Sequence, residues 1–352
     1  MVFSRLARLT LLLMLFTPLS QAAVVLQYHH ISDETPASTS TSPERFAMHL
    51  DYLEEAGFEL VPLQELVNAL KAGRPLPDKT ASITFDDGYI SIYDTAWPLL
   101  KERGWPFTVF INTEPHDQRK PLFMSWDQLR ELHQAGATIA NHTVSHPYLL
   151  RRQADQGEQQ WKTWIRQEIE DAQERIKQEI GEAPMLFAYP FGEFDNTVLE
   201  IAGGLGFVGF GQQSGPLARF NDLRVLPRFP FGGHYGDRQD FATKVNSMPM
   251  PLAAGENPVR WETESGNILD DLVMDGPSAR PVLLLRFEDN FDTGRLNCFA
   301  SGQGLMPVTS EGPWARVQAE RPLTAGRSRY NCTVASGQQG RFFWFSQLWI
   351  IR

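Results

Sequence analysis

From residue 24 to about residue 230, the chain alternates short apolar runs with patterns of helical period, and this alternation restricts the possible folds more than any other feature. Short runs such as 81–85 and 107–111 have the length of strands. The stretches between them carry helix caps and end at glycines. Repeated β-then-α units predict an α/β fold, a distorted (β/α) barrel with mainly parallel strands, closed or nearly closed.

The individual elements follow from the same signals. Ser42-Pro43 predicts the start of a helix that ends near Gly57, and Ser125 with Gln128 predicts a capping box for a second helix. A long polar helix is expected to end near Glu179, and Asp195 to begin a short one. The predicted strands are 24–26, 81–85, 107–111, 138–140, 185–189 and 207–210.

The texture of the chain changes after about Asn246. Met248-Pro249-Met250-Pro251 resembles a linker, and the β-type runs 282–287 and 342–349 follow between Gly-rich turns. We therefore expect a main domain over residues 23–245 and a small β-rich, sandwich-like domain over 246–352. The second domain carries an aromatic cluster that favours a strand in the core, with a carbohydrate-stacking surface as the alternative: Phe342, Phe343, Trp344, Phe345 and Trp349.

Residues 1–22 have the pattern of a signal peptide. Arg5 and Arg8 precede an apolar run over 9–19, which ends in Ser20-Gln21-Ala22-Ala23. The run is short for a membrane anchor, which is the alternative interpretation. Cleavage after either alanine predicts a periplasmic or secreted protein without stable insertion in a membrane.

The net charge limits the class of binding partner, and the two cysteines bear on whether the chain contains a disulfide. A formal net charge of −10 argues against nucleic acid or an anionic membrane surface as the main partner and favours a neutral or cationic substrate. Cys298 and Cys332 are the two cysteines of the chain. In an oxidising compartment they are able to form a disulfide, and two unpaired buried thiols are the alternative.

Four polar segments lie where predicted strands end: Tyr28-His29-His30, Thr84-Phe85-Asp86-Asp87-Gly88-Tyr89, Asn141-His142-Thr143-Val144-Ser145-His146 and Tyr189-Pro190-Phe191-Gly192. The carboxyl ends of parallel strands meet on one face of such a fold, which is where its chemistry is placed. Two adjacent carboxylates and a pair of histidines are therefore expected to be neighbours in space.

These residue types suit a catalytic metal site. Asp86 and Asp87 are consecutive, so their side chains diverge, and one is able to bind a metal while the other faces a reacting water. His142 and His146 are four residues apart and complete a three-ligand set, as in catalytic zinc sites. Iron or cobalt is also compatible with nitrogen and carboxylate ligands. Each motif alone has an ordinary alternative, namely a polar turn or a helix face; the same holds for Tyr28-His29-His30 as a strand cap.

The second and third of these segments together resemble the NodB-homology polysaccharide deacetylases, carbohydrate esterase family 4, over about residues 24–230. The resemblance implies that Asp86 is the general base and that Asp87, His142 and His146 bind a divalent metal, with Zn²⁺ first and Co²⁺, Ni²⁺ or Fe²⁺ as alternatives. The early Tyr-His segment resembles the permuted branch that includes N-deacetylases of poly-β-1,6-N-acetylglucosamine. In that branch the histidine after the tyrosine is the general acid, and it corresponds to His29 in this chain.

The third motif departs from the family. Many members carry an arginine ahead of Pro-x-Gly, whereas this chain has Phe187-Ala188-Tyr189-Pro190. Arg228 is the candidate to replace that arginine beside the base. The backbone N–H of Phe191 is expected to stabilise the oxyanion, and Tyr189 and Arg228 are expected near the oxyanion or substrate.

The expected function is metal-dependent hydrolysis of acetamide groups on a polysaccharide of N-acetylglucosamine, with release of acetate. Peptidoglycan deacetylation and hydrolysis of a small amide at the same site are alternatives within the enzyme class. Two other classes stay open: a non-catalytic glycan-binding protein, and a mononuclear iron oxygenase, which the α/β alternation disfavours. The sequence leaves the glycosidic linkage and the oligomeric state undetermined.

Overall fold

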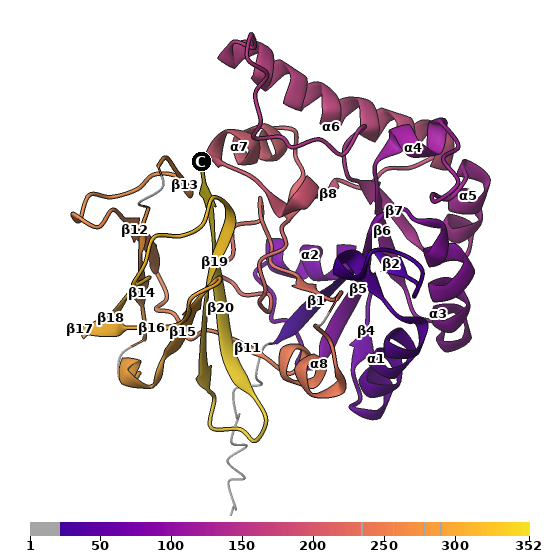
Figure 1. The fold of residues 1–352 in the computed structure, drawn as a ribbon. Helices are drawn as coiled ribbons and strands as arrows, with labels where there is room; N and C mark the ends of the chain where they lie inside the picture. Colours follow the sequence, from indigo (N-terminus) through magenta and orange to yellow (C-terminus); the bar gives the residue numbers. More distant parts are fainter. Residues whose placement is uncertain (1–21, 234, 256, 277–278, 289–290) are drawn as a thin grey trace, which may run out of the picture.

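The computed structural model describes residues 22–352 with gaps at 234, 256, 277–278 and 289–290. Residues 1–21, on which the predicted signal peptide falls, lie outside the described part. Among the described helices, none is both long and apolar enough to cross a bilayer. Figure 1 shows an α/β layer on the right and a β-rich C-terminal layer on the left.

The central sheet has eight strands in the order β10-β1-β5-β6-β7-β8-β9, with β4 paired to β5. All of these pairs are parallel. The strands are β1 (Ala23–Tyr28), β4 (Glu59–Leu60), β5 (Thr80–Asp87), β6 (Phe107–Ile111), β7 (Thr138–Asn141), β8 (Leu186–Ala188), β9 (Val208–Phe210) and β10 (Phe229–Pro230). Two short strands, β2 (His30–Ile31) and β3 (Ser40–Thr41), pair separately. The predicted α/β fold with mainly parallel strands is confirmed.

An irregular segment closes the sheet between its two ends. The N–H of Gly209 in β9 donates to the carbonyl of Leu223, and the N–H of Leu226 donates back to the carbonyl of Gly209. Three residues later the same segment becomes β10, which pairs with β1. The barrel is therefore closed by a short irregular stretch, which accounts for its distortion and carries Arg228 into its interior.

Helices cover the outside of this barrel, and their caps follow the sequence signals. Ser42 accepts from the N–H of Arg45 at the start of α1, and Ser125 with Gln128 forms the predicted capping box of α5. Asp195 caps α7. The helices are α1 (Pro43–Glu55), α2 (Leu63–Lys71), α3 (Trp97–Arg103), α4 (Thr113–Asp117), α5 (Trp126–Gln134), α6 (Glu158–Ile180), α7 (Asn196–Gly204) and α8 (Arg238–Val245). Of these, α2, α4 and α8 were not anticipated from the sequence.

Side-chain alternation along the strands places polar groups inside the barrel. In β1, Leu26 and Tyr28 pack in the outer hydrophobic layer with Phe85 of β5. Gln27 and Asp86 have the opposite orientation and contact one another. The outer layer supplies most of the apolar packing, so the interior can hold a polar cluster near the carboxyl ends of the strands.

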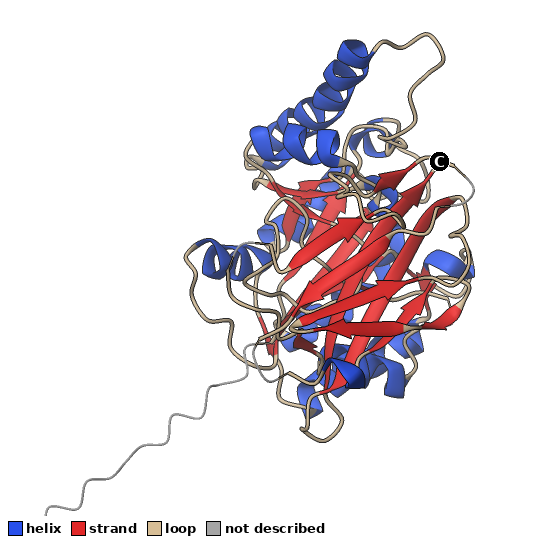
Figure 2. Cartoon of the chain, turned by 90° about the vertical axis from the view of Figure 1, so that its left-hand side faces the viewer, coloured by secondary structure: helices blue, strands red, loops and turns tan. Residues whose placement is uncertain are grey.

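Two further sheets form the C-terminal layer, and Figure 2 views the molecule from this side. One sheet has the order β11-β20-β19-β15-β16, with β13 also paired to β20, and the other has the order β12-β14-β18-β17. The strands are β11 (Met248–Pro249), β12 (Val259–Glu262), β13 (Val273–Met274), β14 (Val282–Arg286), β15 (Asn297–Ala300), β16 (Gly304–Met306), β17 (Val308–Glu311), β18 (Trp314–Gln318), β19 (Gly326–Ala335) and β20 (Phe342–Ile351). The β-rich, two-sheet character expected of this part is confirmed.

The expected linker at Met248-Pro249-Met250-Pro251 needs a correction. Met248 and Pro249 form β11, which pairs in parallel with Phe343 and Trp344 of β20. Proline is tolerated there because β11 lies at the edge of its sheet. The first residues after α8 are thus already part of the second layer.

A bidentate ion pair joins the C-terminal layer to the α/β layer. Both Nη atoms of Arg341, in the turn before β20, donate to the carboxylate of Asp78 at 2.7 Å, and its Nε donates to the carbonyl of Asn246. The bidentate geometry gives the contact a defined orientation. The two layers therefore pack in one arrangement.

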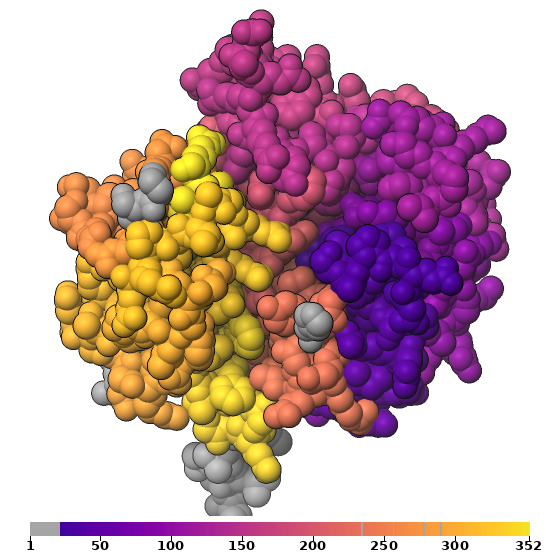
Figure 3. Space-filling view, in the orientation of Figure 1, coloured from indigo at the N-terminus to yellow at the C-terminus, as the bar shows by residue number. Residues whose placement is uncertain are grey.

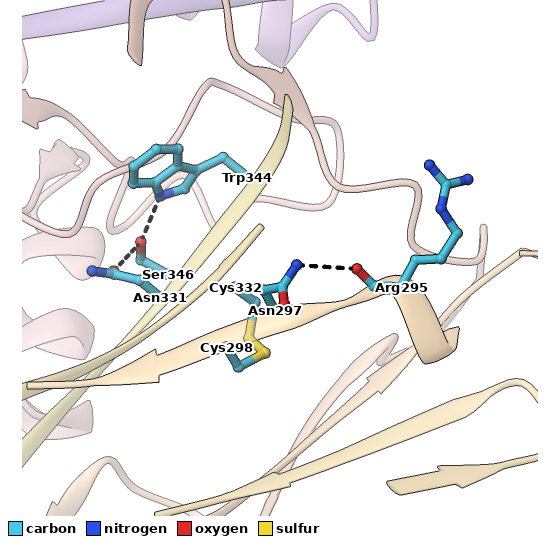
Figure 4. The surroundings of a disulfide bond; sticks show 7 residues. All are labelled: Arg295, Asn297, Cys298, Asn331, Cys332, Trp344 and Ser346. Atoms are coloured by element: carbon cyan, nitrogen blue, oxygen red, sulfur yellow. Dashed lines mark hydrogen bonds between the residues drawn. A yellow bond between two sulfur atoms is a disulfide. The ribbon is translucent and has the colours of Figure 1, made fainter. Parts of the chain in front are cut away.

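Cys298 of β15 and Cys332 of β19 face each other across the two strands and form a disulfide (Figure 4). The bond lies in the buried face of the sheet, since both cysteines are fully buried. It closes a loop whose ends are 34 residues apart in the sequence. Of the two states that the sequence left open for these cysteines, the structure has the disulfide.

The length of the loop that the disulfide closes predicts how much the disulfide stabilises the fold. Replacing both cysteines by alanine should lower the free energy of unfolding by about 2–4 kcal/mol, because the unfolded chain regains the entropy of an open loop. Guanidinium unfolding of the variant and of the oxidised protein, followed by circular dichroism, measures the difference. Equal unfolding midpoints would contradict a stabilising role of the disulfide.

Candidate active site

Three side chains from the ends of β5 and β7 meet in a group suited to a metal ion. The Nε2 atoms of His142 and His146 lie 3.5 and 3.4 Å from Oδ1 of Asp87. One ligand atom from each of the three residues lies within 4.8 Å of the others. Two nitrogen ligands and one carboxylate leave coordination positions open, as in catalytic zinc sites.

The hydrogen bonding and the protonation state of His142 suit a metal ligand. Its Nδ1–H donates to the carbonyl of Ala188 at 2.7 Å, so that Nε2 carries the lone pair. This Nε2 is buried and has no hydrogen-bond partner among the described residues. Burial lowers the pKa of His142 to about 3 and also lowers the pKa of His146. Both imidazoles are therefore neutral near pH 7, the form that binds metals.

Local hydrogen bonds shape the loop that carries these histidines. Oδ1 of Asn141 accepts from the N–H of Thr143, whose Oγ1 accepts from the N–H of His146. The backbone is left-handed at Thr143 (φ 74°) and His146 (φ 54°). Glu168 of α6 accepts from the N–H groups of Val144 and Ser145 and so ties the loop to a long helix. These contacts hold two non-glycine residues in a costly backbone conformation.

Asp86 lies inside the barrel, where Arg228 holds it. Nη1 and Nη2 of Arg228 donate to the two carboxylate oxygens at 2.7 and 2.8 Å, and Nε2 of Gln27 adds a third hydrogen bond. Both charged side chains are fully buried. Burial alone would raise the pKa of Asp86, but the charge of Arg228 and its hydrogen bonds to the carboxylate outweigh burial and hold that pKa well below its usual range. Asp86 is therefore ionised.

The two aspartates diverge as expected from the sequence, through a left-handed turn at the strand end. Asp87 has φ 72°, and Gly88 beside it has φ 76°. A Cβ at Gly88 would lie 2.7 Å from Nε2 of the buried His116, so only glycine fits there. Burial raises the pKa of Asp87 to about 6. Asp87 thus points to the histidines, whereas Asp86 points to Arg228.

His29, rather than His30, faces the pocket. His29 lines a hollow of about 630 Å³ together with Asp87 and His146. His30 is 5% exposed and stacks on Tyr89 with ring centroids 3.5 Å apart. Burial lowers the pKa of His30 to about 4, which leaves it neutral. The geometry therefore puts His29 in position to reach a bound molecule.

In the fourth polar segment, Tyr189-Pro190-Phe191-Gly192, one residue lines the pocket and another lies in the core. Phe191 lines the pocket and has a left-handed backbone, with φ 58°. Tyr189 is fully buried, its hydroxyl donates to the carbonyl of Arg224 and its N–H to the carbonyl of Phe210. The expectation that Tyr189 contacts substrate is corrected, because all these groups are engaged away from the pocket. Arg228 lies beside Asp86, as expected of the residue that replaces the missing arginine, whereas the expectation that it contacts the oxyanion or substrate is corrected, because its side chain is fully buried on Asp86.

Two arginines of the C-terminal layer reach the same pocket, which Figure 3 shows as a hollow between the yellow and indigo surfaces. Arg327 and Arg329 of β19 line it. Nη1 of Arg327 donates to the carbonyl of Phe191 and, at 2.7 Å, to Oε1 of Gln212. The C-terminal layer therefore forms one wall of the active-site pocket.

Sequence reasoning missed Gln27, Glu168, Arg327 and Arg329. Gln27 had a weak signal, since a polar residue interrupts the apolar run of β1 directly before Tyr28. Glu168 lies on a helix with many charged residues, and the arginines lie far along the chain in a different layer. Nothing local distinguishes these three from ordinary surface residues.

Comparisons with known proteins agree with this geometry. Residues 73–210 match the family model of polysaccharide deacetylases. The poly-β-1,6-N-acetyl-D-glucosamine N-deacetylase of Escherichia coli K12 is 25% identical over 244 residues, which cover 58% of this chain and 36% of that protein. The chain thus spans little more than a third of the length of that curated relative.

Solved structures agree as well. IcaB from Ammonifex degensii superposes with a TM-score of 0.53 at 28% identity, over 60% of this chain and 92% of that one. The deacetylase PplD of Streptococcus pyogenes, solved with acetate, gives a TM-score of 0.56 at 24% identity, over 62% of this chain and 95% of that one, and shows a shared fold. By the family match, the shared barrel and the Asp-Asp and His-x3-His segments at its strand ends, residues 73–210 form part of a polysaccharide deacetylase domain of the NodB-homology type.

Proposed function

We propose that the protein is a metal-dependent N-deacetylase that hydrolyses acetamide groups on a polysaccharide of N-acetylglucosamine and releases acetate. The observation that carries this proposal is the placement of an ionised carboxylate, Asp86 on Arg228, beside the three-residue set of Asp87, His142 and His146. A base next to a three-ligand metal set is the combination that amide hydrolysis by water requires. The name of the E. coli relative supports the polysaccharide.

Asp87, His142 and His146 would hold the divalent cation, with Zn²⁺ as the first candidate for two imidazoles and a carboxylate. When bound, such a cation lowers the pKa of water and polarises a carbonyl oxygen. The buried, unpartnered Nε2 of His142 supports this assignment, because a buried polar atom ordinarily has a partner.

The chain's own residues then have separate tasks. Asp86 accepts the proton of the attacking water, while Arg228 keeps it ionised and oriented. We assign the N–H of Phe191 as the donor to the developing oxyanion, which is supported by the position of Phe191 in the wall of the pocket. His29, at the open side of the pocket, gives a proton to the leaving amine. The products are acetate and a free amino sugar.

We also propose that the protein is exported, with residues 1–22 removed. Ala23 is the first residue of β1, is fully buried and pairs with Thr80. Cleavage after Ala22 would leave this strand complete, whereas cleavage after Ala23 would remove one of its pairs. Residues 23–245 would then form the catalytic domain and residues 246–352 an accessory domain.

Asp86→Asn tests the assigned base. The variant should lose at least about 100-fold in the rate of acetate release from β-1,6-linked N-acetylglucosamine oligomers, because asparagine accepts no proton from water. It should retain the zinc content of the native protein. β-1,4-linked oligomers and peptidoglycan, assayed beside the β-1,6 oligomers, identify the polymer.

This substitution also leaves the Arg228 charge buried and unpaired, which should destabilise the fold by about 3–5 kcal/mol. The matched control is therefore the double variant Asp86→Asn/Arg228→Gln, which should be as inactive but more stable than the single variant. Near-native turnover by folded Asp86→Asn would exclude Asp86 as the base.

His29→Gln tests the acid. Hydrolysis of the amide should fall by about 100-fold, because the amine leaves poorly without a proton. Hydrolysis of 4-nitrophenyl acetate should be retained, since its leaving group needs no proton. If His30→Gln gave the loss and His29→Gln did not, the acid would be at His30.

His142→Ala tests the metal set without an activity assay. Elemental analysis should find about one equivalent of zinc in the native protein and little in the variant, since one of three ligands is gone. His133→Ala is the control, because His133 on α5 contacts the carbonyl of Ala137 outside the site. Equal zinc content in both variants would disprove the assigned ligands.

A further inference from the structure

One face of the large C-terminal sheet continues the active-site pocket into a second hollow. On β19, Arg327, Arg329, Asn331 and Thr333 are spaced two apart and therefore share a face. The two arginines line the active-site pocket, and the next two residues line the second hollow, of about 340 Å³. This row of four residues is about 20 Å long, given the rise along a strand. The two hollows are thus neighbours on one surface.

The register of the sheet shows what surrounds this row. Asn331 lies opposite Phe299 of β15 and Thr333 opposite Trp344 of β20, so all four side chains are on the same face. The second hollow is lined by Thr243, Phe299, Asn331, Thr333, Phe342 and Trp344. The cysteines of the disulfide and Tyr330 alternate with this row and lie on the buried face of the sheet. The outer face therefore combines aromatic rings with amide and hydroxyl groups.

Phe299 is a large apolar side chain that is exposed on this face. It is 42% exposed in a strand whose neighbours Cys298 and Ala300 are buried. Trp344 is held more firmly, since its ring edge meets Phe229 at 5.4 Å between centroids and its Nε1 donates to Ser346. Ser346 in turn donates to Asn331 (Figure 4). A fixed ring and an exposed ring thus flank a hydrogen-bonding amide.

We propose that this face binds the sugar units of the polysaccharide that flank the reacting unit. This inference rests on the proposed function, and it names how the polymer is held. Sugar rings offer C–H faces to aromatic side chains and hydroxyls to amides and alcohols, and ligand sites combine apolar walls with a few placed polar groups in this way. The occupant follows from continuity, since a polymer bound at the metal site must leave the pocket, and β19 forms its wall. In Figure 3 the recess continues downward between the yellow strands and the salmon surface of the region of α8.

The aromatic residues that the sequence analysis grouped as one cluster lie on two opposite faces of β20. Trp349 is fully buried and packs against Tyr330, as a core residue does. Phe342 and Trp344 face the second hollow. The two interpretations of the cluster apply to opposite faces of one strand, because side chains alternate along it.

Phe299→Ala tests the proposal, since an exposed ring can be removed without opening a cavity in the core. Binding is measured by calorimetry in the Asp86→Asn/Arg228→Gln background, with the β-1,6-linked N-acetylglucosamine hexamer and dimer as probes. The dissociation constant for the hexamer should rise about five- to tenfold, while that for the dimer should not change. Asn331→Ala is a second variant with the same expectation.

Ile268→Ala is the matched control, because Ile268 is 72% exposed and lies outside both hollows. Unchanged hexamer affinity in both face variants would overturn the proposed sugar-binding face, even where the native protein releases acetate. The opposite combination of results would have a different meaning. Hexamer binding that depends on Phe299, without acetate release by the native protein, would support the face and overturn the deacetylase.

Discussion

The buried ion pair between Asp86 and Arg228 is the interaction on which the rest of this structure depends. A lone carboxylate inside a barrel would be neutralised or would destabilise the fold, because its desolvation is costly. Here both of its oxygens accept from one guanidinium, whose Nε donates to the carbonyl of Gly211 and whose Nη1 also contacts Thr84. The pair keeps a negative charge at a fully buried position, out of contact with bulk solvent.

The same pair connects catalysis with barrel closure. Arg228 follows the irregular segment that pairs with β9, and it directly precedes β10, which pairs with β1. Asp86 therefore gains its ion-pair partner when the two ends of the sheet meet. An open barrel would leave Asp86 without its partner, so folding and the assembly of the site are one event.

Backbone strain marks the residues that face the pocket. Asp87, His146 and Phe191, which line the pocket, all have positive φ, a conformation that favours glycine. Hydrogen bonds from neighbouring elements hold them, among them the contact between Arg327 and the carbonyl of Phe191. The C-terminal layer is in this sense part of the active site, since it forms a wall of the pocket and supports the loop opposite the histidines.

By itself, the sequence determined the α/β alternation, the caps of the main helices and the four polar segments at strand ends, because these depend on local periodicity and on residue chemistry. It also placed Asp86, Asp87, His142 and His146 together, since parallel strands end on one face. Only the tertiary structure decided that Tyr189 belongs to the core, that Arg228, a candidate from the sequence, does bind Asp86, and that Arg327 enters the pocket. Each of these contacts joins residues 35 to 142 positions apart. No local pattern records such a distance, because it is set by how the sheet closes and how the second layer packs on it.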